Sequence, residues 1–573
     1  MHRQVGGMTA RKRVALLCLL FACSVLQVPC WCQYDSTSID SSLNATASPD
    51  HIVLTWTESP ATTLTVTWRS SQEIEDGWVD YRQAGAGRSA AVKVRAQARE
   101  FSAVATDRQG RFTLYSATLR NLRPDTGYAY RVFSGDRGSP EYQFSTLPAS
   151  PRRFSFLIFG DSQPGEKDPP SYAAWHQTLS AAVARHPQAR FAIHSGDLTD
   201  EGMNFLHWHN WFEAAGDILA RLVFLPVIGN HDCVGELKDP AGRRPSYWIP
   251  SYLLMQFPVF PNGPDGLVGQ AWSFDSGDAH LTVINSERAY GDAAVAARQI
   301  EWLDRDLSAT KKRWKLVFFH RPPYYSRACR TNEEVRKTLC PVIEKHRADV
   351  VFSGHDHVFC RTYPMKDGNI FSSPADGTVY YITGRSGGYA YTDVSRKIWH
   401  AAFYQVQDQP CYLLCEIDSG RLTVRAYKTD GTVIDVYTID KDRPERSTLT
   451  PAPARFSRPR FSLNGDLPPM HASDNGATAL SIDGKWFVNA RVFLGCLGGT
   501  AVARENGVEL ILDTREMTVP EGQARVFRKE DIPPKPGIPP VRHSIFVSAD
   551  VIREFTGYDF TYDEALNVLH FSR

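Results

Sequence analysis

The sequence predicts three folded domains of different class: an all-β sandwich, then an α/β sandwich of β-sheets flanked by helices, then a small α+β domain. Three observations predict this order. Alternating strands occupy residues 50–148, apolar runs alternate with helical stretches in 151–440, and a weak internal repeat occupies 476–573. A length of 573 residues with 42% hydrophobic residues suits several globular domains.

The overall charge is close to neutral. The chain has 64 Lys and Arg residues against 63 Asp and Glu residues, which gives a formal net charge of +1. No global electrostatic field would therefore attract nucleic acid or an anionic membrane, and we expect no nucleic acid as a structural partner. The oligomeric state stays open.

Residues 1–32 have the pattern of an export signal. Arg11-Lys-Arg13 precedes the apolar run Val14–Val28, which matches the charged and hydrophobic parts of a signal peptide. The run is shorter than the roughly 20 apolar residues of a membrane-spanning helix. We expect a cleaved signal and a secreted or cell-surface protein. The alternative is lipid attachment at Cys23, which Phe21 fits poorly.

The cysteine count allows a disulfide if the protein is exported. Of the 11 cysteines, the leader holds Cys18, Cys23, Cys30 and Cys32. The seven that remain cannot all pair within one chain, because their number is odd. Cys329, Cys340 and Cys360 lie close to the proposed ligand loops, which predicts one disulfide among them in an exported protein.

Residues 33–49 are a polar linker, and residues 50–148 then alternate between apolar and polar positions. Ile52–Trp56 and Leu64–Trp68 show this pattern, with turn residues about every ten positions, as is typical of a β-sandwich. Leu122–Val132 resembles the tyrosine-corner strand of fibronectin type III domains. This domain has no catalytic cluster, so we expect a structural or spacer role.

In residues 151–440, five apolar runs end in residues that bind metal ions, with helices expected at Tyr172–Arg185 and Ala293–Leu307. Ligands of α/β sheets gather outside the carboxyl ends of the strands, so these side chains should converge. The runs and the residues after them are Arg153–Phe159 with Asp161 and Gln163; Phe191–His194 with Asp197 and Asp200; Leu222–Ile228 with Asn230, His231 and Asp232; Trp314–Phe319 with His320; and Val350–Phe352 with His355 and His357. Carboxylate, amide and imidazole groups suit Fe, Mn or Zn. His207 and His209 follow the second run and could line the same pocket.

The blocks Gly-Asp, Gly-Asp-Leu-Thr-Asp, Gly-Asn-His-Asp, His-Arg-Pro-Pro-Tyr and Gly-His-Asp-His, in this order, resemble those of the calcineurin-like metallophosphoesterase superfamily. With the fibronectin-like domain before them, residues 50–440 are most similar to the purple acid phosphatase branch. The resemblance implies an exported dinuclear metal enzyme that hydrolyses phosphomonoesters. Alternatives are a phosphodiesterase or nucleotide hydrolase of the same superfamily, or a cell-surface binding module with a vestigial site.

The resemblance also implies roles for the residues of these blocks. Asp197 would bridge two metal ions, and water acidified by the ions would attack phosphorus in line. His231 would stabilise the transition state or protonate the leaving alkoxide, and Asp232 is a second catalytic candidate. One ion would be held by Asp161, His357 and Gln163, and the other by Asn230, His320 and His355.

Two positions depart from the family pattern. Purple acid phosphatases have a tyrosine three residues after the bridging aspartate, where this chain has Asp200, and the wider superfamily often has histidine in place of Gln163. Both changes weaken the site that prefers ferric iron, so the identity of the metals stays open among Fe, Mn and Zn. Without that tyrosine the resemblance implies a colourless protein.

The second domain should end near Asp440, after strands at Val379–Ile382 and Cys411–Asp418 and a hairpin around Asp430-Gly431. The loop Gly384–Gly388 either borders the substrate or is a plain turn. Residues 441–475 are rich in Pro, Arg and Ser, which predicts a linker that keeps the last domain at a distance.

The internal repeat lies in residues 476–573. Ile482–Val488 with Phe493–Gly498 is echoed by His543–Val547 with Val551–Tyr558, and a short strand follows each unit. This pattern resembles the copper amine oxidase N-terminal-like, or stalk, domain of exported bacterial proteins. No histidine cluster supports copper, so we expect contact with the cell wall, the cell surface or another protein.

Overall fold

The computed structural model describes residues 43–572, apart from 72, 75, 106–107, 166–168, 234–248, 288–292, 328–331, 454–459, 469–477, 483, 505–506, 521–522, 528–543 and 565. The predicted export signal, residues 1–32, lies outside this part. Across the described residues, no helix is both long and apolar enough to cross a membrane.

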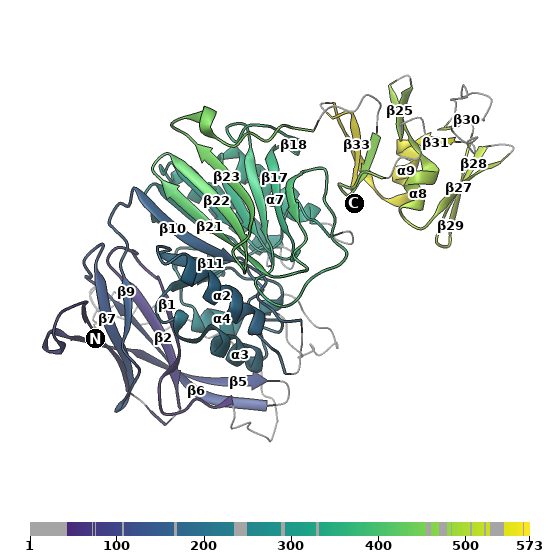
Figure 1. The fold of residues 1–573 in the computed structure, drawn as a ribbon. Coiled ribbons are helices and arrows are strands. Elements are labelled where there is room, and N and C mark those ends of the chain that lie inside the picture. The colour runs from purple at the N-terminus through teal and green to yellow at the C-terminus, as the bar shows by residue number, and fades with distance from the viewer. Residues whose placement is uncertain are drawn as a thin grey trace, which may run out of the picture.

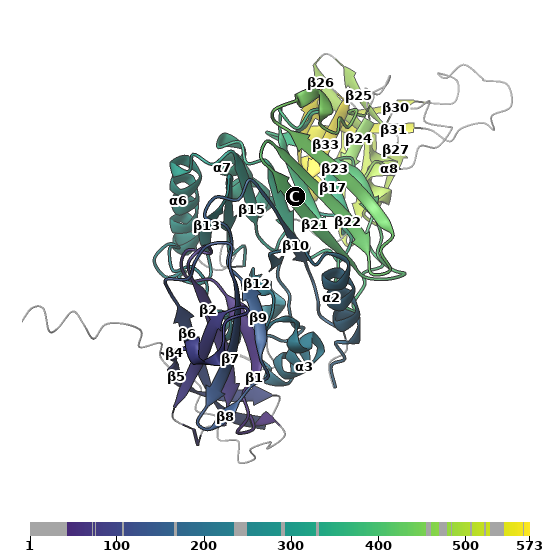
Figure 2. The same cartoon turned by 60° about the vertical axis from the view of Figure 1, so that its left-hand side comes forward.

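The largest sheet has ten strands and runs through both of the first two domains (Figures 1 and 2). Its order is β23-β22-β21-β10-β11-β12-β1-β2-β6-β5. The bounds are β1 (Asp50–Thr55), β2 (Leu64–Ser70), β5 (Gln97–Ala105), β6 (Arg108–Leu119), β10 (Arg153–Phe159), β11 (Phe191–His194), β12 (Val223–Pro226), β21 (Cys411–Asp418), β22 (Arg421–Lys428) and β23 (Val433–Asp440). β1 and β12 pair in parallel, with Leu54 opposite Val223. Hydrogen bonding therefore continues across the predicted boundary at 148–151.

A second sheet completes the N-terminal sandwich, in the order β4-β3-β7-β8 with β9 beside β7. Its strands are β3 (Gly77–Gln83), β4 (Val92–Arg95), β7 (Gly127–Ser134), β8 (Arg137–Gly138) and β9 (Tyr142–Ser145). The Trp68 and Tyr115 rings stack at 5.3 Å in the core. The backbone N–H of Arg123 donates to the Tyr128 hydroxyl over 2.8 Å, which is the contact expected of a tyrosine corner. The predicted all-β sandwich is confirmed.

The second domain contains another sheet of eight strands, in the order β13-β14-β15-β16-β19-β17-β18 with β20 beside β17. Its strands are β13 (Trp272–Ser276), β14 (Ala279–Val283), β15 (Trp314–Phe318), β16 (Val350–Ser353), β17 (Phe359–Lys366), β18 (Asn369–Ile370), β19 (Thr378–Thr383) and β20 (His400–Tyr404). The five apolar runs thus divide between two sheets, with β10, β11 and β12 in one and β15 and β16 in the other. The sequence predicted β-sheets flanked by helices, and the strand pairing assigns each run to its sheet.

The two sheets pack face to face, and helices cover their outer faces (Figure 2). The helices are α2 (Ala173–Arg185), α3 (Phe205–Ala215), α4 (Ser251–Gln256), α6 (Ala293–Ala309) and α7 (Glu333–Lys345). Along β10, Phe156 and Ile158 belong to the core between the sheets. Leu157 and Phe159 instead pack with the helix residue Trp175. Burial on both sides explains why this strand is apolar throughout. The predicted α/β sandwich is confirmed.

The C-terminal domain consists of two similar strand–helix–hairpin units. The first is β26 (Lys485–Asn489), α8 (Ala490–Gly495), β27 (Thr500–Arg504) and β28 (Gly507–Leu512), and the second is β31 (Ser544–Ser548), α9 (Ala549–Thr556), β32 (Asp559–Asp563) and β33 (Val568–Ser572). The remaining strands are β24 (Arg460–Leu463), β25 (Ala479–Ile482), β29 (Arg515–Val519) and β30 (Ala524–Phe527). β26 and β31 pair antiparallel, so the two units join in the middle of one sheet.

The predicted linker 441–475 is not a plain spacer in its described residues. Its segment β24 pairs in parallel with β33, and therefore belongs to the C-terminal domain. Just beyond it, the carboxylate of Asp466 accepts hydrogen bonds from Lys397 and from the Ser395 hydroxyl of the second domain. The expectation that this segment holds the last domain at a distance was wrong, because the two domains touch there.

The disulfide predicted among Cys329, Cys340 and Cys360 is also corrected in part. Cys360 is buried in β17 as a free thiol. Cys329 lies outside the described residues.

Candidate metal centre

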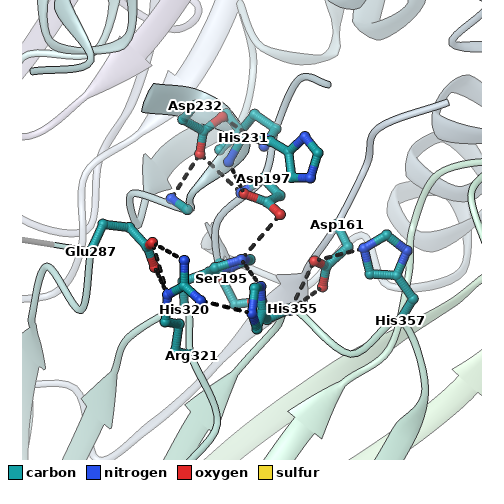
Figure 3. A network of polar contacts seen from close by, with 12 residues as sticks. Asp161, Ser195, Asp197, His231, Asp232, Glu287, His320, Arg321, His355 and His357 are labelled. Atoms are coloured by element: carbon teal, nitrogen blue, oxygen red, sulfur yellow. Dashed lines mark hydrogen bonds and ion pairs between the residues drawn. The ribbon is translucent and has the colours of Figure 1, made fainter. Parts of the chain in front are cut away.

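The candidate site lies where strand ends from both large sheets meet (Figure 3). Asp161 follows β10, Asp197 follows β11, and Asn230 with His231 follows β12 of the first sheet. His320 follows β15, and His355 with His357 follows β16 of the second sheet. The predicted residues therefore converge, from strand ends of two facing sheets.

Two groups of side chains could each hold a metal ion, and they share one residue. Asp197, His320 and His355 form the first group, and Asp161, Asp197 and His357 form the second, with the ligand atoms of each group within 4.8 Å of one another. His320 Nε2 lies 3.1 Å from Asp197 Oδ2, and His357 Nε2 lies 3.3 Å from Asp161 Oδ1. All five residues are buried. A carboxylate shared in this way can give one oxygen to each of two ions.

Backbone carbonyls orient two of the imidazoles. His320 Nδ1 is 2.9 Å from the carbonyl oxygen of Ser195, and His357 Nδ1 is 2.7 Å from that of Tyr389. A carbonyl only accepts, so each Nδ1 must carry a proton, which leaves Nε2 as the atom available to a metal ion. This is the arrangement that a metal-binding histidine requires.

Asn230 follows Gly229, which packs against Asp197, and Gln163 lies two residues after Asp161. The Oδ1 atom of Asn230 and both polar side-chain atoms of Gln163 have no hydrogen-bond partner in the described protein. A buried amide without a partner costs stability, so an unsatisfied acceptor on a loop that carries proposed ligands fits a metal ligand. The residues present therefore fit two ions.

The backbone is strained at four of the proposed ligands. Asp161, Asp197, His355 and His357 have positive φ angles of 50°, 56°, 77° and 52°. Non-glycine residues rarely adopt this conformation, and it concentrates at functional sites where the fold enforces it.

Close packing also restricts the residue type at two positions beside the proposed ligands, Gly229 and Gly354. A Cβ atom on Gly229 would lie 2.2 Å from Asp197 Oδ1, and one on Gly354 would lie 2.6 Å from Asp161 Oδ2. Only glycine permits the carboxylates to approach so closely.

Asp232 has a different role from the catalytic one predicted. Its carboxylate accepts backbone N–H groups from Asp197, Leu198 and Gly229 over 2.9 Å each, and it is fully buried. Both oxygens are thus used to fix the two loops that carry Asp197 and Asn230. We correct the prediction accordingly: Asp232 is a positioning residue, whose carboxylate is turned into these two loops.

His231 is the predicted catalytic residue that retains access to solvent, with 27% of its side chain exposed. Its Nδ1 lies 2.8 Å from the carbonyl oxygen of Asp200 and 3.2 Å from the Asp200 carboxylate. Burial alone would lower the pKa of His231, but the carboxylates of Asp197 and Asp200 outweigh burial and raise the pKa to about 10. The ring can therefore donate a proton.

The same surroundings act on the shared aspartate. Burial alone would raise the pKa of Asp197, but the neighbouring His320 and His231 outweigh burial and hold it well below its ordinary value. Asp197 is thus ionised, as a bridging ligand must be.

The structure adds four residues that the sequence reasoning missed. Arg321 forms a bidentate ion pair with the buried Glu287, and its Nη1 lies 3.2 Å from His355 Nε2 (Figure 3). Tyr391 and Tyr389 lie against the His357 ring, with centroids 4.3 and 5.3 Å away. Glu287 could have been found, because the apolar strand β14 leads into it as the other strands lead into their ligands.

The histidines expected near the pocket lie elsewhere. His207 is buried, with its Nδ1 3.0 Å from the Tyr172 hydroxyl. His209 faces the N-terminal sandwich, where its Nδ1 lies 3.3 Å from Arg69. Neither residue belongs to the groups that share Asp197.

Comparisons with known proteins identify the families that the first two domains match. Residues 49–146 match the family "Purple acid Phosphatase, N-terminal domain", and residues 154–359 match the family "Calcineurin-like phosphoesterase". The chain is 26% identical to "Acid phosphatase type 7" of Mus musculus, over 59% of this chain and 78% of that protein. It is 23% identical to "Probable inactive purple acid phosphatase 1" of Arabidopsis thaliana, over 57% of this chain, and spans only 58% of that protein.

The fold is similar to a solved structure, that of purple acid phosphatase PPD1 from yellow lupin (Lupinus luteus) seeds. The TM-score is 0.57 with 19% identity, over 69% of this chain and 74% of the other. The two family matches end at residue 359, before the C-terminal repeat. In its first two domains the chain thus matches, in this order, a purple acid phosphatase N-terminal domain and a calcineurin-like phosphoesterase domain.

Proposed function

We propose that this protein is an exported, dinuclear metal-dependent phosphoesterase that hydrolyses phosphomonoesters. One observation carries the proposal: two groups of buried ligand residues share the single carboxylate of Asp197. Some relatives are named as inactive, including the one from Arabidopsis described above. In this chain the shared aspartate, Asn230, His231 and the three ligand histidines are all in place, which favours an active site.

The ligands divide between two ions. Asp161, His357 and the amide of Gln163 would hold one, while Asn230, His320 and His355 would hold the other, and Asp197 would contact both. Two bound cations would neutralise the charge of a phosphoryl group and increase the acidity of water. The donor set of oxygen and imidazole nitrogen suits Fe, Mn or Zn.

His231 would supply the proton for the leaving group. The Asp200 carbonyl accepts a hydrogen bond from Nδ1–H, so the Nε2–H of the protonated ring is left to act on substrate. A phosphomonoester with a poor alkoxide leaving group gains most from such an acid. Asp200 therefore orients the acid, at the position where purple acid phosphatases carry a tyrosine.

Hydrolysis of p-nitrophenyl phosphate and of bis(p-nitrophenyl) phosphate by the purified, metal-loaded chain tests the proposal. We expect the monoester to be the better substrate, and activity to vanish after chelation and return with added metal. A preference for the diester would support the phosphodiesterase alternative. Hydrolysis of neither ester by a protein that binds two ions would support a binding module instead.

We also propose that the C-terminal repeat domain contacts the cell surface. It has the strand–helix–hairpin repeat expected of a stalk-like domain, and it follows the catalytic domain in a chain that begins with an export-signal pattern. Fractionation of cells that express the full chain, compared with cells that express a chain ending at Pro453, tests this. Equal release of both chains into the medium would contradict surface contact.

A further inference from the structure

A second cluster of metal-binding side chains lies at the junction of the N-terminal sandwich and the catalytic domain. His51 is on β1, and His209 and Glu213 are on α3. The strand β1 and the helix α3 lie side by side in both views (Figures 1 and 2). One ligand atom from each residue lies within 4.8 Å of the others. None of the three belongs to the groups around Asp197.

His51 is the buried member of this cluster. Only 3% of its side chain is exposed, and neither ring nitrogen has a hydrogen-bond partner among the described residues. Its ring stacks on Phe212 at 4.5 Å and 12°, and its backbone has a positive φ of 47°. Burial holds the pKa of His51 well below its ordinary value, so the ring is neutral at physiological pH. A buried imidazole with both nitrogens unsatisfied is costly unless something binds it.

His209 and Glu213 stand four residues apart on one helix, which places both on the same face of α3. The carboxylate oxygen Oε1 of Glu213 lies 3.8 Å from His51 Nε2, and 63% of the Glu213 side chain is exposed. Burial and the adjacent Arg69 lower the pKa of His209, which keeps this ring neutral as well. Two neutral imidazoles and one carboxylate, open to solvent on one side, form a donor set typical of Zn²⁺ sites with a vacant fourth position.

Arg69 is the cation nearest to this cluster. Its guanidinium forms a bidentate pair with Asp50 at 2.6 and 3.1 Å, so its charge is already balanced. Its Nη2 also lies 3.3 Å from His209 Nδ1. An ion bound at Nδ1 would displace this long contact and leave the pair with Asp50 intact. An ion bound at Nε2 of His209 would leave the proton on Nδ1. Arg69 would then have to turn away, because two N–H donors would face each other.

We propose that His51, His209 and Glu213 form a third metal site that binds Zn²⁺, separate from the phosphoesterase centre. Because its ligands come from β1 and α3, the ion would cross-link the N-terminal sandwich to the catalytic domain. The site goes beyond the proposed function and does not depend on it.

Zinc stoichiometry of the full-length chain tests the proposal. After chelation and reloading with Zn²⁺ alone, we expect Glu213→Gln and His209→Ala each to bind one ion per chain fewer than the wild type. Glu301→Gln, which changes an exposed glutamate on α6, is the matched control and should bind as many ions as the wild type. Phosphatase activity of the Glu213→Gln protein should be unchanged. Equal stoichiometry in all four proteins would overturn the proposal.

An Asp197→Ala background separates this site from the phosphoesterase centre. Adding Glu213→Gln to Asp197→Ala should remove one further ion per chain, whether or not the centre around Asp197 binds metal. Added Zn²⁺ should also raise the melting temperature of Asp197→Ala more than that of Asp197→Ala/Glu213→Gln. The same zinc-dependent rise in both proteins would show that His51 is only a packing residue stacked on Phe212.

Discussion

The Nδ1 atom of His231 lies 2.8 Å from the carbonyl oxygen and 3.2 Å from the carboxylate of Asp200. If His231 acts on substrate and not on metal, His231→Ala should lower kcat by about 10²–10⁴-fold while metal content stays unchanged. Elemental analysis beside the assay checks both points. Loss of metal in this variant would identify His231 as a ligand.

The same contact makes Asp200 a positioning residue. We expect Asp200→Asn to lower kcat less than His231→Ala does, by about 10-fold, because the backbone carbonyl still holds the ring. In the double variant Asp200→Asn/His231→Ala, activity should be no lower than in His231→Ala alone, since both changes act through one group. Additive losses would show that Asp200 contacts substrate or metal directly.

Replacing Asp197 should change metal content and activity, whereas replacing Asp232 should change stability. Asp197→Ala should lose one to two ions per chain and nearly all activity, and two ions retained would contradict the bridging role. Asp232→Ala leaves buried N–H groups of two loops without an acceptor. Each N–H group left unsatisfied should lower the free energy of unfolding by about 1–3 kcal/mol. The melting temperature of the metal-free Asp232→Ala protein should therefore be lower than that of the metal-free wild type. Equal melting temperatures would contradict the positioning role.

His280 predicts a pH dependence of stability far from the metal centre. Its two ring nitrogens lie 2.8 Å from Asp275 and 2.9 Å from Asp306, and these hydrogen bonds outweigh burial and raise its pKa to about 9. The stabilisation should be complete below the unfolded-state pKa of about 6.5 and lost as pH rises toward 9.

For His280→Gln we therefore expect a loss of roughly 2–3 kcal/mol at pH 6 and little loss above pH 9, since each pKa unit is worth about 1.4 kcal/mol. Denaturant unfolding at both pH values measures this difference. An equal loss at both values would show that the charge of His280 contributes nothing.

Colour depends on whether a tyrosine reaches ferric iron. Tyr324 and Tyr325, which follow His320 in the motif, pack against the Trp399 ring. Tyr391 is the tyrosine whose ring lies 4.3 Å from that of His357. We expect a colourless metal-loaded protein, because Asp200 replaces the family's tyrosine. A visible band that Tyr391→Phe removes, and Tyr325→Phe does not, would contradict this expectation and identify Tyr391 as the ligand.

The position of a C-terminal truncation should decide its effect. A chain ending at Asp440 loses the ion pair between Lys441 and the buried Asp349, whereas a chain ending at Pro453 keeps it. Both lose the partner of Lys397, whose side chain is fully buried against Asp466. We expect both to hydrolyse small esters, with melting temperatures that fall in the order full length, ending at Pro453, ending at Asp440. Loss of activity in a folded chain ending at Pro453 would show that the tail shapes the active site.

Local patterns predicted the strand ends well, because a buried strand such as β10 must be apolar along its whole length and must stop where polar ligands begin. They could not assign β15 and β16 to a separate sheet, since periodicity carries no information about which strands pair. β24 was missed for a related reason. Four residues between proline-rich and glycine-containing stretches form a strand only because β33, far along the chain, pairs with them.

The remaining site residues depend on tertiary contacts. Tyr391 reaches His357 from a loop whose sequence has no metal-binding pattern, and His51 meets His209 only because two domains pack together. Asp232 adjoins His231 in sequence, which suggested shared chemistry, but its side chain turns into the loops instead. Adjacent residues on a turn can face opposite directions.

The parallel pairing of β1 with β12 has a consequence for engineering. If the N-terminal domain were removed, β12 would become an outer strand, with unpaired N–H and C=O groups along an apolar segment. Such strands promote self-association through new intermolecular pairing. The second domain of this chain is thus less stable against self-association when the first is absent. A recombinant fragment that begins near residue 151 would be expected to precipitate, even though every residue of its metal centre is present.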